Sequence, residues 1–227
     1  MRLGVLFSGG KDSTLALHKV VENNQQVKCL ITLRSKNPES YMFHTPNVNL
    51  TNLQAQALNL PLIVQETLGK KEEELIDLEK AITQAVNQFE IEGIVTGAIE
   101  SVYQSKRIEN ICNSLSLSCF NPLWKKNQQV LLEELLEKQF KVIICGIFAY
   151  PLNKSFLGKL IDRTVIDKLI ELQHKYGISP AGEGGEIETT VLDAPLFSKR
   201  IEIIESEIFS RENEGVFKIL QAKLILK

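Results

Sequence analysis

The residues best suited to chemistry form a six-residue segment near the N-terminus, with the sequence Ser-Gly-Gly-Lys-Asp-Ser at Ser8–Ser13. The segment follows a short apolar run, residues 3–7, and precedes a stretch with apolar residues at helical spacing, residues 14–21. This pattern predicts a strand, a tight loop and the start of a helix. A helix N-terminus offers free N–H groups and the positive end of a dipole, which favour a phosphate. We call Ser8–Ser13 the Gly-Gly loop.

The residue types of the Gly-Gly loop suit phosphate binding. The glycines let the backbone approach an anion without a Cβ in the way, the lysine adds charge, and the serine hydroxyls can bond phosphate oxygens. The aspartate can hold Mg²⁺. An ordinary turn, with glycine for turning and Asp or Ser for capping, is the alternative. The candidates for phosphate binding are Ser8, Gly9, Gly10, Lys11, Asp12 and Ser13, with Asp12 also the metal candidate.

A second unusual segment, Gly182–Thr189, holds three carboxylates and three glycines within eight residues. Glycine disfavours a helix, so the sequence predicts a compact turn, residues 182–188, which we call the acidic turn. Carboxylates on such a turn can bind Mg²⁺, hold ammonium or accept a proton from an attacking amine. A solvated polar loop leading into a strand at residues 190–192 is the alternative. The candidates for this chemistry are Glu183, Glu186 and Glu188.

The first half of the chain alternates strand-like apolar runs with helix-like segments. Strands are expected at residues 3–7, 27–33, 61–65 and 93–97, and helices at 14–21, 49–58, 71–89 and through 107–112. This order predicts a parallel sheet covered by helices, whose ligands bind at the carboxyl ends of the strands. Three segments should therefore face one crevice, namely the Gly-Gly loop, residues 33–35 and residues 97–99.

The alternation loosens after residues 121–124, which predicts a domain boundary between residues 1–122 and 123–227. In the second half we expect helices at 129–139 and 156–176, a strand at 142–145, a loop at 178–185 and a hairpin of residues 200–209 and 216–226. The expected fold class is α/β: a parallel sheet with helices on both faces, followed by a smaller C-terminal α+β domain.

Length and composition are those of a globular protein, with 227 residues, 44% hydrophobic and 24% charged. The net charge of −2 lacks the excess of positive charge that nonspecific nucleic-acid binding requires. The first apolar run ends at Ser8 and no long apolar stretch follows, so we expect neither a signal peptide nor a membrane span. The four cysteines include no C-x-x-C pair, and we expect them to be reduced, as in a cytoplasmic protein.

Four blocks of sequence resemble known families. The Gly-Gly loop is similar to the SGGxDS signature of the PP-loop ATP pyrophosphatases, which cleave ATP between its α and β phosphates. Within that superfamily, three further blocks resemble the diphthine–ammonia ligase family. They are residues 41–47 (YMFHTPN), residues 97–124 (GAIxSxYQxxRxExxC, then PLW) and residues 182–197 (GEGGEIET, then DAPLF). The resemblance covers about residues 1–200, and Ile187 stands where an aromatic residue is usual.

The resemblance implies a HUP-like, Rossmann-like ATPase domain and an enzyme that amidates diphthine on translation elongation factor 2. ATP, with Mg²⁺ at Asp12, would adenylate the diphthine carboxylate, and ammonium would displace AMP. The Gly-Gly loop would hold the β and γ phosphates. The residues counted as catalytic are Lys11, Asp12, Glu183, Glu186 and Glu188.

The same resemblance assigns the remaining contacts, which lie at other strand ends and on one helix. They are Thr32 and Leu33 for the adenine, Gly97 and Ala98 for the ribose or α phosphate, and His44, Tyr103, Gln104 and Arg107 for the substrate. Arg107 suits the α phosphate or the substrate carboxylate best, because a guanidinium binds such oxygens in pairs.

Two other functions stay open at this point. A PP-loop tRNA-modifying enzyme commonly uses paired cysteines or a bound metal cluster, and the sequence has neither a C-x-x-C pair nor an evident basic patch. A non-catalytic ATP-binding module would use the Gly-Gly loop but would leave the acidic turn unexplained. No glutaminase domain fits the chain, which favours free ammonium as the donor. The oligomeric state is open, with a homodimer as one alternative, and neither nucleic acid nor membrane is expected as a partner.

Overall fold

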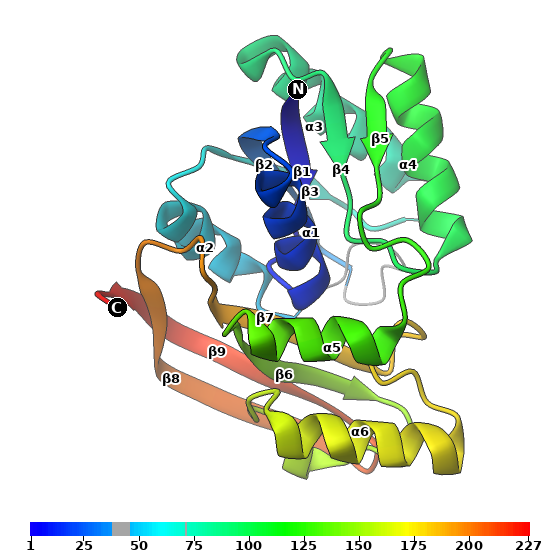
Figure 1. Ribbon diagram of the computed structural model, residues 1–227, viewed down its shortest axis with the longest axis vertical. Helices are drawn as coiled ribbons and strands as arrows, with labels where there is room; N and C mark the ends of the chain where they lie inside the picture. The colour runs from blue at the N-terminus through cyan, green and yellow to red at the C-terminus, as the bar shows by residue number, and fades with distance from the viewer. Residues whose placement is uncertain (38–45, 71) are drawn as a thin grey trace.

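The computed structural model describes residues 1–37, 46–70 and 72–227, which build two sheets and the helices that cover them (Figure 1). The first sheet has five strands, all parallel, in the order β3-β2-β1-β4-β5. In chain order these strands are β1 (Arg2–Leu6), β2 (Gln26–Ser35), β3 (Leu62–Thr67), β4 (Gly93–Val95) and β5 (Ser118–Phe120). The predicted parallel sheet is confirmed. It has one additional strand, β5, which was not predicted because three residues are too few to show a strand pattern.

Helices lie on both faces of this sheet, because its central strands are apolar on both sides. Along β2, Cys29 and Ile31 belong to one hydrophobic cluster, whereas Leu30 between them belongs to the other. One face is covered by α1 (Lys11–Glu22) and α2 (Thr51–Leu58), which follows a short 3-10 helix, η1 (Val48–Leu50). The other face is covered by α3 (Glu73–Phe89) and α4 (Val102–Ser114).

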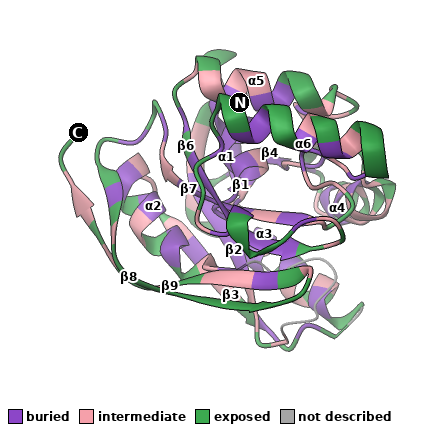
Figure 2. Cartoon of the chain, turned by 90° about the horizontal axis from the view of Figure 1, so that it is seen from below, coloured by how far each residue is buried: buried purple, intermediate pink, exposed green. Residues whose placement is uncertain are grey.

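The second sheet is antiparallel and has four strands in the order β7-β6-β9-β8. Two helices lie beside it, and the long β8–β9 hairpin runs out to one side with much of its surface exposed (Figures 1 and 2). The strands are β6 (Lys141–Phe148), β7 (Ile187–Asp193), β8 (Arg200–Arg211) and β9 (Glu214–Ile225), and the helical elements are α5 (Gln128–Glu137), η2 (Lys154–Phe156) and α6 (Arg163–Tyr176). The predicted α+β character of this half is confirmed.

The start of α6 differs from the sequence prediction of a helix over residues 156–176. Residues 154–156 form only the short helix η2, and Leu160 then makes an isolated bridge to Ile143 of β6. The helix begins after Asp162, whose side chain accepts a hydrogen bond of 2.9 Å from the N–H of Val165. Apolar spacing extends through the whole segment, but the capping aspartate sets the first turn. Within the described residues, no helix is long and apolar enough to cross a membrane.

One hydrophobic cluster joins the two sheets. It contains Leu15 and Leu17 of α1 together with Leu131 of α5, Ile144 of β6 and Val191 of β7. The sheets themselves lie on either side of the boundary predicted at residues 122 and 123, with the first ending at Phe120 and the second starting at Lys141. The division into two domains stays a prediction, since the two halves share this core.

Removal of the α6 cap offers a test of where that helix begins. Asp162→Ala leaves the N–H of Val165 without its acceptor, and we expect a loss of ~1 kcal/mol in the free energy of unfolding. For a chain of this size that loss lowers Tm by roughly 2–4 °C. Asp167→Ala is the matched control, because Asp167 lies exposed on the same helix and only approaches Arg163 at 4.0 Å. Equal Tm values for the two variants, measured by circular dichroism, would contradict the assignment.

Candidate active site

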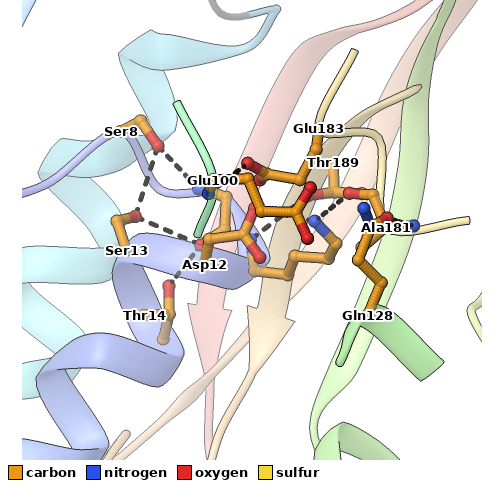
Figure 3. A network of polar contacts seen from close by, with 11 residues as sticks. Ser8, Asp12, Ser13, Thr14, Glu100, Gln128, Ala181, Glu183 and Thr189 are labelled. Atoms are coloured by element: carbon orange, nitrogen blue, oxygen red, sulfur yellow. Dashed lines mark hydrogen bonds and ion pairs between the residues drawn. The ribbon is translucent and has the colours of Figure 1, made fainter. Parts of the chain in front are cut away.

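The Gly-Gly loop leaves the end of β1 and turns directly into α1 (Figure 3). Gly9 has a φ of +80°, which favours glycine, and Gly10 is the N-cap of the helix. The carbonyl of Gly10 accepts hydrogen bonds from the hydroxyls of Ser13, at 3.2 Å, and Thr14, at 2.8 Å. The hydroxyls of Ser8 and Ser13 lie 3.2 Å apart. The loop therefore has the strand–loop–helix geometry in which backbone N–H groups bind phosphate.

The Gly-Gly loop also runs along the outer edge of β7, the end strand of the second sheet. The N–H of Val191 donates to the carbonyl of Gly9 at 3.0 Å, and the N–H of Lys11 donates to Thr189 Oγ1 at 3.1 Å. A Cβ at Gly10 would lie 3.2 Å from the carbonyl oxygen of Thr189. Thr189 ends the GEGGEIET segment and was not predicted to have a role. In the structure its hydroxyl binds the N–H of Lys11.

Lys11 is directed away from solvent and toward the segment before the acidic turn. Its side chain is only 4% exposed, and Nζ donates to Asp12 Oδ2 at 2.7 Å and to the carbonyl oxygen of Ala181. The N–H of Ala181 in turn donates to Gln128 Oε1 at 3.1 Å. The ammonium group of Lys11 thus links the Gly-Gly loop to the second half of the chain. No side-chain pattern could have indicated Ala181, because its backbone oxygen makes the contact.

Glu183 and Glu188 face the charged residues of the Gly-Gly loop. Figure 3 shows Asp12, Glu100 and Glu183 close together beside the loop, and Glu183 Oε2 accepts a hydrogen bond of 3.1 Å from the N–H of Glu100. Burial, followed by repulsion from Asp12, raises the pKa of Glu183 to about 7. Burial likewise raises the pKa of Glu188 to about 7, against the opposing attraction of Lys11. Both carboxyls therefore titrate near neutral pH, where proton acceptors in active sites are useful.

Glu186 is separated from the other two carboxylates of the acidic turn. Its Oε1 accepts a hydrogen bond of 2.9 Å from the N–H of Ser179, and a Cβ at Gly184 would lie 2.7 Å from the same oxygen. Its Oε2 is buried and has no hydrogen-bond partner within the described parts of the chain. The carboxylate of Glu186 therefore folds back over Gly184 and is bonded to the segment that precedes the turn.

The two predicted nucleotide contacts at strand ends lie at the carboxyl edge of the first sheet. Thr32 and Leu33 follow Ile31, the last residue of β2 that pairs with β1, and Thr32 Oγ1 donates to the carbonyl of Phe7 at 2.6 Å. Gly97 lies against the start of α1, where a Cβ would be 2.7 Å from the backbone nitrogen of Ser13. A glycine is thus required there by the close approach of α1 itself. Nucleotide contacts by Thr32, Leu33, Gly97 and Ala98 stay predictions.

The predicted substrate residues on α4 form a group of their own. The guanidinium of Arg107 lies 3.5 Å from the centre of the Tyr103 ring and donates to Glu72 Oε1 at 2.7 Å. The N–H of Gln104 donates to Ser101, the N-cap of α4, at 3.4 Å. His44 lies outside the described residues, so its predicted role stays untested. Substrate contacts by the α4 group stay predictions as well.

The residues around the Gly-Gly loop fit a Mg²⁺ ion that is bound together with the phosphates of a nucleotide. Among the described residues, no three or more His, Cys, Asp or Glu residues are grouped to hold a metal ion. The carboxylate of Asp12 is 29% exposed at the first turn of α1, beside the loop. Mg²⁺ is commonly held by one or two carboxylates together with substrate phosphates, and Asp12 suits that arrangement.

The raised pKa of Glu188 predicts how stability depends on pH. The folded pKa of about 7 exceeds the ordinary value of 4.5, so the unfolded carboxyl ionises first as pH rises through this interval, and stability falls. In buffer without nucleotide or metal, Glu188→Gln should therefore raise Tm at about pH 8 by clearly more than at about pH 5, where the folded carboxyl is still neutral and only the unfolded one has begun to ionise. Glu79→Gln, at an exposed position on α3, is the control. A gain in Tm that is equal at both pH values would refute the assignment.

Family comparison covers both halves of the chain. A model described as the diphthamide synthase N-terminal domain matches residues 1–119, and one described as the diphthamide synthase C-terminal domain matches residues 127–225. Among solved structures, a predicted subunit of a tRNA methyltransferase from Methanocaldococcus jannaschii has a TM-score of 0.45 at 18% identity, covering 86% of this chain and 98% of that one.

Several curated relatives are much more similar in sequence. Diphthine–ammonia ligases from Bos taurus and Homo sapiens are 37% and 36% identical; the matches cover 95% and 92% of this chain and 87% and 85% of those relatives. The diphthine–ammonia ligase of Schizosaccharomyces pombe is 32% identical over 100% of this chain and 40% of its own length. On the paired family models and these relatives, the chain belongs to the diphthamide synthase family.

Proposed function

We propose that the protein is a diphthine–ammonia ligase, which uses ATP and ammonium to convert the carboxylate of diphthine into an amide, with AMP and pyrophosphate as products. The observation that carries the proposal is the direct contact between the Gly-Gly loop and the second half of the chain. Lys11 reaches the carbonyl of Ala181, and Val191 donates to Gly9. The loop proposed to bind phosphate therefore lies beside a pair of carboxyls with raised pKa values. The names of the relatives fit this combination.

The Gly-Gly loop supplies the phosphate side of the reaction. Its N–H groups, apart from that of Lys11, which is bonded to Thr189, and the N-terminus of α1 would hold the β and γ phosphates, helped by the hydroxyls of Ser8 and Ser13. Lys11 would neutralise phosphate charge from its position beside Asp12. Mg²⁺ bound through Asp12 would add positive charge at the phosphates. Thr32 and Leu33 would receive the adenine, and Gly97 and Ala98 the ribose or α phosphate.

A carboxylate needs activation before ammonia can replace one of its oxygens, because oxide is a poor leaving group. Transfer of the AMP group to the diphthine carboxylate, with loss of pyrophosphate, provides a better leaving group. The protein must hold the carboxylate in line with the α phosphorus and keep water out. Arg107, with Tyr103 and Gln104 on the same helix, would orient the diphthine, and we include His44 in the substrate contacts.

The acidic turn supplies the ammonia side of the reaction. Glu183 and Glu188, when ionised, can hold an ammonium ion and accept one of its protons. The resulting ammonia attacks the acyl carbon, the bond to the AMP oxygen breaks, and AMP leaves with the electron pair. Glu186 would act indirectly, since its carboxylate is bonded to the N–H of Ser179, just before the turn.

We propose that translation elongation factor 2, which carries the diphthine, is the protein substrate and therefore the partner. The reaction would take place in the cytoplasm. The net charge of −2 gives no reason to propose nucleic acid as a partner. A homodimer is one alternative for the assembly.

Incubation with diphthine-bearing elongation factor 2, ATP, Mg²⁺ and ammonium tests the proposal. Mass spectrometry should show conversion of carboxylate to amide together with one AMP per amide. Asp12→Asn should lower the rate by about 100-fold or more, since it removes the charge proposed to hold Mg²⁺ beside the phosphates. Asp77→Asn on α3 is the control. Release of ADP in place of AMP would overturn the proposal, and absence of any nucleotide product would favour a non-catalytic ATP-binding module.

The rate of amide formation should also depend on pH through the carboxyls of the acidic turn. A carboxyl accepts a proton only when ionised, so the rate should rise from about pH 6 to about pH 8 with an inflection near the shared pKa of about 7. Rates are compared at a constant concentration of unprotonated ammonia. Glu183→Gln and Glu188→Gln should each abolish or displace this inflection, whereas Glu186→Gln should keep it. An unchanged profile in all three variants would exclude these carboxyls as the proton acceptors.

A further inference from the structure

Gln54 is a completely buried polar residue at the joint between the two halves of the molecule. It lies on α2, with 0% of its side chain exposed. Its Nε2 donates to the carbonyl of Gly9 at 2.9 Å and to the carbonyl of Val191 at 2.8 Å. Gly9 belongs to the Gly-Gly loop and Val191 to β7, so one side-chain amide is bonded to both.

The two hydrogen bonds of Gln54 use both protons of its amide nitrogen. The carbonyl of Gly9 also accepts from the N–H of Val191, so Gly9, Gln54 and Val191 form a closed three-way joint. The amide oxygen of Gln54 is buried without a hydrogen-bond partner in the described parts of the chain. It would lie 2.2 Å from a Cβ at Gly9. The donated bonds, rather than the oxygen, therefore account for the polar contacts of this amide.

The joint fixes a distance that the reaction depends on. Strand β7 begins within the last residues of the acidic turn and carries Glu188, three residues before Val191. The Gly-Gly loop carries Lys11 and Asp12, two and three residues after Gly9. A bond that ties Gly9 to Val191 therefore sets how the phosphate-binding residues face the carboxyls. Displacement of reacting groups by about 1 Å can change a rate by 100-fold.

We infer that Gln54 is a positioning residue for the ligase reaction, which keeps the acidic turn in register with the Gly-Gly loop so that ammonia meets the activated carboxylate before water does. The inference rests on the proposed function. In the productive step ammonia attacks the acyl carbon and AMP leaves; in the wasteful step water attacks the same carbon, and AMP leaves with the original carboxylate restored. Gln54 touches none of the reacting groups and acts through the position of β7.

The amount of amide formed per AMP released separates positioning from simple support of the fold. Gln54→Met keeps the length and volume of the side chain and removes both donors. We expect about tenfold less amide per AMP, with the surplus AMP arising from hydrolysis. A merely structural role would lower amide and AMP together and leave their ratio near that of the wild type. Gln56→Met is the matched control, because Gln56 is exposed and lies two residues after Gln54 on α2; it should keep the wild-type ratio.

The outcomes are distinguishable from failure of the proposed function. If the wild-type protein forms no amide, the proposed function itself is wrong. If the wild type is active and Gln54→Met gives the wild-type ratio, the inference about Gln54 is wrong. If Gln54→Met shows no cooperative thermal unfolding, the isosteric Gln54→Glu, which retains one donor when protonated, is measured instead. Failure of both variants to fold would make Gln54 a structural residue and overturn the inference.

Discussion

The structure depends on backbone pairing between the Gly-Gly loop and the outer edge of β7. An unpaired edge strand exposes N–H and carbonyl groups that attract other strands. Here the N–H of Val191 is satisfied by the carbonyl of Gly9, and Thr189 is bonded to the N–H of Lys11. The same contacts that protect the edge of the antiparallel sheet bring the acidic turn to the parallel one. Neither sheet contains the proposed site alone.

The electrostatics of the site oppose stability. Burial raises the pKa values of two carboxyls beside Asp12 to about 7, and the attraction of Lys11 offsets only part of that effect. Such an arrangement is unfavourable by itself, and a cation held beside it, as proposed, would favour the ionised carboxyls. We infer that the acidic turn lowers the free energy of unfolding in exchange for its proposed role in binding, a trade-off that is typical of functional sites.

Much of the fold and part of the site could be predicted from the sequence. The apolar runs that become β1, β2 and β4 are short and bounded by clear loops, so strand periodicity located them, and the order of elements gave the parallel sheet. The Gly-Gly loop and the acidic turn were identified by residue type. The orientation of Glu186 could not be, because neighbouring carboxylates look alike until the turn is folded. Gln54 donates to a main-chain carbonyl 45 residues away, and Ala181 accepts from the side chain of Lys11 through its own carbonyl; such contacts leave no pattern in the sequence.

The hydrophobic cluster that crosses from α1 to β6 has a consequence for motion. Leu15, Ile144 and Val191 are all at most 1% exposed within one continuous core. Rotation of the two halves apart, as the lobes of a clamshell, would bring this apolar surface into water, at a cost of about 25 cal/mol for each Å². Ligand binding at the proposed site is therefore expected to leave the two halves together. The shared core thus opposes a hinge motion between the two halves of the enzyme.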